Sequence, residues 1–231
     1  WTSPASKAHY PQRWRLTNTA TDLEVLPAHQ TYTHDGAADP NRQLLASDAS
    51  ALTSVDYLPD TADDAAAGDA LHCQFVSADL GADLVYASGS VIKMALQGFE
   101  PNANCNQSLQ LYAAIVDSAG TTVRRVLRSK VVHSVELSLA LSNNFLSTTQ
   151  DGASYTTVAG DRLVVEISVQ GDPAGGGGVQ GHNATLRWGG NGGGGDLPEN
   201  DTETGTTLNP WIEFTTAAPS TTQVIVTTMV G

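Results

Sequence analysis

Apolar and polar residues alternate with a period of two in several stretches of the chain, most clearly within residues 109–115, 131–141 and 161–169. Successive side chains of a β-strand point to opposite faces of a sheet, so each stretch would place one apolar face on a core. In the longest stretch that face would consist of Val131, Val135, Leu137, Leu139 and Leu141, together with His133. About eight or nine strands are predicted in total, the others lying at residues 71–76, 91–99, 184–188, 211–214 and 223–230.

Turn signals separate these stretches. Residues 117–120 and 151–152 begin with aspartate and end with glycine. They predict tight turns, because glycine readily adopts positive φ and aspartate hydrogen-bonds to its own backbone. No convincing amphipathic helix is present, since the alanine-rich residues 63–70 form a short run interrupted by glycine. Short strands joined by turns, without crossover helices, predict an all-β fold, namely an antiparallel, jelly-roll-like β-sandwich.

The chain divides into an N-terminal part and a main part within a single domain. Residues 1–45 mix proline, histidine and asparagine around one strand candidate, Tyr10 to Leu16, and predict an extended N-terminal arm with a first strand. Residues 46–231 then form the β-sandwich, an architecture that often runs to roughly 200–250 residues in one domain. The glycine runs at 175–178 and 192–195 predict loops at the ends of the sandwich.

The charge balance restricts the partners. Asp and Glu number 24 against 11 Lys and Arg, which gives a net charge of −13. Such a chain is repelled by nucleic acid and by anionic membrane surfaces, so neither is expected as a partner. No apolar run approaches the ~18 residues that a membrane-spanning helix requires.

Motifs of catalysis and cofactor binding are missing from the sequence. Neither glycine run has a phosphate-loop ending, no nucleophile elbow occurs, and the six histidines have no metal-site spacing. We therefore expect no catalytic residues and no cofactor. The acidic residues 195–203 are best interpreted as a solvated acidic turn; because they also offer oxygen ligands, a structural calcium ion is the leading metal candidate. Cys73 and Cys105 could form one disulfide or remain two thiols.

Tryptophans raise a second class of function. Exposed aromatic platforms bind sugars in many β-sandwich modules, and Trp14, Trp188 and Trp211 are the candidates. Trp188 and Trp211 share predicted strands with Leu186 and Ile212, so packing in the core or at a strand edge is the favoured interpretation for both. A carbohydrate-binding module thus remains an alternative function. A glycan-cleaving enzyme remains a further one, since the sequence singles out no pair among the 24 acidic residues.

Four segments in the C-terminal half carry a family resemblance. They are residues 160–167 (GDRLVVEI), 184–189 (ATLRWG), 196–199 (DLPE) and 209–214 (NPWIEF). In this order they resemble a group of tailed-phage structural proteins with the pattern GDRLVVEI…TLRFG…DLPE…NPWIEF, with Trp188 where phenylalanine is usual. The resemblance covers about residues 70–215. It implies a virion protein without assigned activity but does not distinguish the capsid, the tail and a fibre. We expect a capsid decoration role on a phage head, favoured over the tail, with the major capsid protein or other virion proteins as partners.

The N-terminal region predicts how such a protein would attach. Three of the eleven basic residues lie within the first fifteen positions, among aromatic side chains. A basic, aromatic arm could bind an acidic neighbour. By analogy with the three-fold positions of capsid shells, a homo-oligomer is expected, with a trimer favoured. The alternative is that the arm folds back as an edge strand of its own sandwich. The predicted interface residues are Trp1, Lys7, Tyr10, Arg13, Trp14 and Arg15.

Overall fold

Strands account for all the regular secondary structure in the part of the chain that the computed structural model describes. That part comprises residues 12–20, 28–32, 41–46, 55–57, 68–101, 103, 106–171, 184–189 and 195–215. Within these ranges there is no helix, which confirms the all-β prediction. The strands are β1 (Gln12–Ala20), β2 (Asn41–Ala46), β3 (Val55–Tyr57), β4 (Gly68–Ser77), β5 (Val85–Tyr86), β6 (Val91–Phe99), β7 (Gln107–Val116), β8 (Val123–Glu136), β9 (Ser142–Thr149), β10 (Tyr155–Thr156), β11 (Arg162–Gly171), β12 (Thr185–Trp188) and β13 (Trp211–Phe214).

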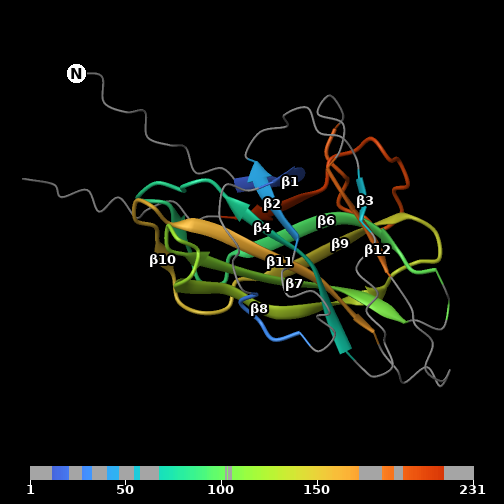
Figure 1. Cartoon of the computed structure of the whole chain (residues 1–231), viewed down its shortest axis with the longest axis horizontal. Helices are drawn as coiled ribbons and strands as arrows, with labels where there is room; N and C mark the ends of the chain where they lie inside the picture. The colour runs from blue at the N-terminus through green and yellow to red at the C-terminus, as the bar shows by residue number, and fades with distance from the viewer. Residues whose placement is uncertain are drawn as a thin grey trace, which may run out of the picture.

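One large sheet contains all the strands except β5 and β10, which pair with each other. The sheet runs in the order β9-β6-β13-β1-β2-β4-β11-β7-β8, and β12 with β3 extends from the end of β6. In Figure 1 the orange β11 and the green β7 run side by side. The pairing departs from a purely antiparallel sandwich at one place, because β2 and β4 are parallel. The connection from Ala46 to Gly68, which includes β3, is long enough for the crossover that parallel strands require.

The sheet curls until its two edges meet. The backbone N–H of Asp151, just after β9, donates to the carbonyl of Leu127 in β8 at 3.0 Å. The side chain of Arg128 donates to the carbonyl of Thr149 at 3.3 Å. These bonds bring β9 against β8 and give the molecule its sandwich-like, jelly-roll-like form, with the core between the two curled halves.

The core receives side chains from nearly every strand of the large sheet. Trp188 of β12 lies edge-on to Phe75 of β4 with ring centroids 5.6 Å apart, and Phe214 of β13 contacts Tyr86 at 5.7 Å. Leu16 of β1 belongs to the same cluster and is fully buried. The N-terminal strand is therefore an internal strand of the sheet, between β13 and β2, rather than an edge strand.

The longest predicted strand differs from the observed one. β8 begins at Val123, before the alternating run, and ends at Glu136, within it. Leu139 of the predicted buried face is 58% exposed, whereas Leu137 is 2% exposed. The register between β7 and β8 shifts at several places, so β8 carries extra residues. Each extra residue changes the face that the following side chains occupy, which breaks the simple alternation.

Candidate binding interface

Arg13 of β1 joins three elements through its guanidinium group. Its Nε donates to Glu213 of β13 at 2.9 Å, and its Nη1 donates to Asp196 at 3.0 Å. The guanidinium also lies over the ring of Trp211, 3.7 Å from the centroid. Each contact is made within the chain, so the charge of Arg13 is compensated by its own sheet and the adjoining acidic turn.

Arg15 completes what we call the N-terminal clamp: Arg13, Arg15, Asp196 and Glu213. The Nε and Nη2 of Arg15 donate to the two carboxylate oxygens of Asp196, at 3.1 and 2.9 Å. This bidentate, half-buried geometry is the strong form of an ion pair. The segment that follows Asp196 is held as well, because Trp211 Nε1 donates to the carbonyl of Leu197 at 2.7 Å.

The predicted interface residues thus fall into two groups. Arg13 and Arg15 lie in the N-terminal clamp, and Trp14 is half-buried against the core. Trp1, Lys7 and Tyr10 lie outside the described residues, as does Cys105, the possible partner of the buried Cys73. The attachment role of these six interface residues stays a prediction.

The acidic residues 195–203 are engaged by protein groups. Glu199 pairs with Lys93 at 2.7 Å, and Asp201 accepts the N–H of Phe145 at 2.6 Å. In the part of the chain with described coordinates, no group of three or more His, Cys, Asp or Glu residues is placed to hold a metal ion. The structure likewise contains no helix, in its described ranges, long and apolar enough to cross a membrane.

The tryptophans proposed as sugar platforms are largely enclosed. Trp188 is 2% exposed and Trp211 is fully buried. Packing in the core is therefore the observed role of both side chains. Trp14 remains partly accessible, so it is the one member of this set that keeps some surface for a ligand.

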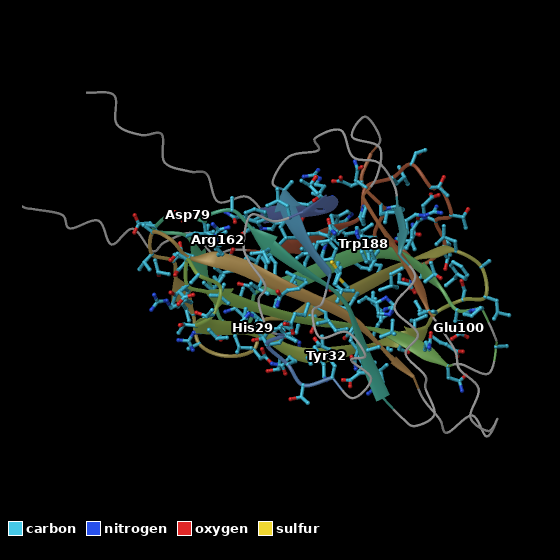
Figure 2. All side chains as sticks on the ribbon, in the orientation of Figure 1. His29, Tyr32, Asp79, Glu100, Arg162 and Trp188 are labelled. Atoms are coloured by element: carbon cyan, nitrogen blue, oxygen red, sulfur yellow. The ribbon has the colours of Figure 1, made fainter. Side chains whose placement is uncertain are left out.

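A buried carboxylate holds residues 28–32 against the outer face of the sheet. Glu166 of β11 is fully buried and accepts hydrogen bonds from the Tyr32 hydroxyl at 2.9 Å, from Gln74 Nε2 at 3.0 Å and from the N–H of His29. Burial raises the pKa of Glu166, and these hydrogen bonds act against that rise. His29 and Tyr32 lie over β7 and β8 (Figure 2), where the His29 ring stacks on Tyr112.

Lys130 of β8 also binds residues 28–32. Its ammonium group donates to the carbonyl of Thr31 at 3.0 Å and to Asp69. We call Glu166, Tyr32 and Lys130 the strand latch. A carboxylate that is enclosed and fully engaged by donors is suited to fixing a segment rather than to acting on a substrate. Sequence reasoning did not single out Glu166, although a lone acid between Val165 and Ile167 is a signal for a paired, buried charge.

β8 presents a surface that combines basic side chains with exposed valines. Four of the eleven basic residues lie on it, and Val123, Val132 and Val135 are 39%, 39% and 42% exposed. Arg124 and Arg125 line an open surface hollow of about 450 Å³ near the start of the strand. Interfaces typically combine apolar contact with arginine, so β8 is the candidate interface that the structure adds. The sequence did not reveal it, because the predicted strand began at residue 131, after the arginines, and Val135 was assigned to the buried face.

The far end of β8 carries an acid pair in which one member, Glu100, is buried and the other, Glu136, is exposed. Glu100 is 1% exposed, accepts the N–H of Gln107 at 2.9 Å and neighbours Glu136 of β8. Burial, together with the adjacent Glu136 carboxylate, raises the pKa of Glu100 to about 7. This acid therefore takes up its proton in a pH range where most carboxylates have lost theirs.

Comparison with known proteins gives distant likenesses. No protein-family model matches the chain, and no curated protein matches it. Among solved structures, a CocE/NonD family hydrolase from Staphylococcus aureus is 10% identical, covers 75% of this chain and 34% of its own, and has a TM-score of 0.39. A structure of infectious bursal disease virus is 14% identical, with the match covering 87% of this chain and 45% of the viral chain, and has a TM-score of 0.26. The chain thus spans less than half of either neighbour, and likenesses at these scores carry no argument about function.

Proposed function

We propose that this chain is a non-catalytic structural protein of a tailed-phage particle, a decoration subunit on the capsid surface bound to the major capsid protein. The proposal starts from the four sequence segments that resemble phage structural proteins. It is supported by where those segments lie and by what their side chains contact.

The observation that carries the proposal is that the residues of the shared segments hold the fold together. Asp161 is 1% exposed and accepts the Val158 N–H at 2.9 Å and the Tyr155 hydroxyl at 2.8 Å, which fixes the turn before β11. Trp188 fills the core, and Asp196 with Trp211 joins the acidic turn to β1 and β13. A signature made of packing and clamping residues marks a scaffold, as expected for a protein whose role is to fold, bind and persist on a particle.

Attachment and assembly follow from the same reasoning. Because β1 is an internal strand, the proposed anchoring arm is restricted to residues 1–11, with Trp1, Lys7 and Tyr10 as its contacts. We propose a homo-oligomer, with a trimer favoured because capsid shells present three-fold positions. Deleting residues 1–11 should leave a folded protein that binds particles poorly, whereas deleting residues 1–20 removes β1 and should prevent folding.

The proposed function is tested by the copy number of the chain on purified particles. Quantitative mass spectrometry, with the major capsid protein as internal reference, should find hundreds of copies per particle. A few or tens of copies would place the chain in the tail instead. Specific binding on a glycan array that is lost in Trp14→Ala would favour the carbohydrate-binding alternative and contradict the proposal.

A further inference from the structure

Positive charge is concentrated at the start of β8 in a chain whose net charge is −13. We call Arg124, Arg125 and Arg128 the β8 basic strip. Lys130, the next basic residue, is already engaged by the strand latch. At physiological salt, charges separated by more than ~8 Å are largely screened. The electrostatic energy of a charged ligand at the strip therefore depends more on these arginines than on the distant acidic surface.

A β-bulge places the consecutive residues Arg124 and Arg125 on the same side of β8. Val123 lies opposite Val116 of β7, and Arg125 lies opposite Ile115, so Arg124 is the extra residue between the two pairs. In a regular strand, neighbouring side chains point to opposite faces. A bulge redirects one of them, and bulges are common on edges and at binding sites. Arg124 and Arg125 consequently both line the hollow, with Val123, Val126, Ser129, Asp151 and Gly152.

The carboxylates near these two arginines are distant or already engaged. Arg124 Nε lies 3.9 Å from Asp161, whose carboxylate accepts hydrogen bonds from Tyr155 and Val158. The Nε of Arg125 is buried and has no hydrogen-bond partner among the residues that the structure describes. A buried donor without an acceptor costs free energy, which a suitable ligand would recover.

The same strand edge already binds a carboxylate of its own chain. Asp151 accepts the N–H of Ser129 through both oxygens, at 3.0 and 3.1 Å, and lies 3.6 Å from Arg128. A carboxylate held by one backbone N–H of β8 and one guanidinium is thus a geometry that this edge supports. Arg124 and Arg125 supply further guanidinium groups, whose planar donors match a carboxylate in the bidentate manner.

We propose that the hollow at the start of β8 binds a carboxylate side chain of an extended, acidic segment of a partner protein, which lies along β8. Val132 and Val135, further along β8 and outside the hollow, are also exposed, and a small anion in the hollow would contact neither. Strand edges are common docking sites for extended segments; β8 pairs with β7 along one edge, and residues 149–151 contact its other edge at Leu127, Arg128 and Ser129. This inference goes beyond the proposed function and does not depend on it, since the isolated protein is sufficient to test it.

The test is a titration of the ¹⁵N-labelled full chain, followed by NMR, with hexaglutamate, hexaglutamine and inorganic sulfate as probes. Hexaglutamate should shift the amide signals of Ser129 and Gly152 and the Nε–H signal of Arg125, and hexaglutamine should not. Arg125→Gln should weaken hexaglutamate binding about tenfold, the typical loss of one charge-assisted hydrogen-bonded pair. Lys93→Gln, the matched control with the same charge change on β6, should have little effect.

A second variant keeps the test decisive if Arg125→Gln folds poorly. Asp151→Asn keeps an oxygen for the Ser129 N–H but removes a negative charge from the hollow, so hexaglutamate should bind it about threefold or more tightly. The proposal is overturned if hexaglutamate shifts no signal around the hollow, or if Lys93→Gln weakens binding as much as Arg125→Gln. Sulfate binding as tight as that of hexaglutamate would overturn the assignment to an extended peptide.

Discussion

The N-terminal clamp and the β8 basic strip contain the same kind of side chain in opposite settings. Arg13 and Arg15 lie on an internal strand, and each donates to Asp196 at 3.1 Å or less. Arg124 and Arg125 lie on the edge strand β8, and the Nε of Arg124 is 3.9 Å from the nearest oxygen of Asp161. The comparison separates arginines that are hydrogen-bonded to carboxylates inside the sheet from two arginines at its edge that have no such close carboxylate among the described residues.

Removing the shared acid of the clamp should give the largest loss of stability. Asp196→Ala leaves two half-buried guanidinium groups without their common acceptor, so the free energy of unfolding should fall by about 3 kcal/mol. Glu199→Ala is the matched control in the same acidic turn, since its ion pair with Lys93 is more exposed and should contribute less than about 1 kcal/mol. Urea unfolding of both variants measures the difference. Equal losses of unfolding free energy would show that the N-terminal clamp does not stabilise the fold more than an exposed ion pair does.

The acid pair at the other end of β8 should make stability depend on pH. The folded pKa of Glu100 is raised to about 7 from an ordinary 4.5. Its stabilising contribution is therefore complete below pH 4.5 and is lost as the pH rises through 7. Glu100→Gln mimics the protonated acid, so this variant should be more stable than the unaltered protein by about 2 kcal/mol near pH 8.

The sign of this effect is isolated by comparing the two proteins at each pH. Burial lowers the pKa of His72 to about 3, so its contribution has the opposite dependence and is lost as the pH falls below 6.5. His72 is common to both proteins, and its effect cancels in the difference. Urea unfolding from pH 4.5 upwards should show the two stabilities converging at the acid end, and a difference that does not change with pH would exclude Glu100 as the titrating group.

The strand latch should contribute less to the free energy of unfolding than the N-terminal clamp or Glu100. Tyr32→Phe removes one donor from the Glu166 carboxylate while the other donors remain, so the free energy of unfolding should fall by about 1 kcal/mol. The His29 N–H, which donates to the same carboxylate, should exchange with solvent faster in the variant. Unchanged hydrogen exchange at His29 would show that residues 28–32 are held by other contacts.

Much of this fold follows from local sequence. The 161–169 alternation corresponds to β11, and the turns at Asp117 and Asp151 lie between strands. The bounds and buried face of β8 could not be predicted in this way, because its register shifts against β7 interrupt the alternation of apolar and polar residues. The ion pairs of the N-terminal clamp could not be predicted for a different reason. Arg15 and Asp196 are 181 positions apart, and no local pattern indicates which of the 24 acids will meet an arginine.

The most direct test of the contrast between the two arginine groups is the free energy of unfolding of Arg15→Gln beside that of Arg125→Gln, measured in urea under one set of conditions. Arg15→Gln should lose about 2 kcal/mol, because the bidentate contact with half-buried Asp196 is broken. Arg125→Gln should stay within about 0.5 kcal/mol of the unaltered protein, as expected for a side chain that the fold does not need. Equal losses in the two variants would contradict the account, because they would show that the β8 basic strip is also part of what holds the fold together.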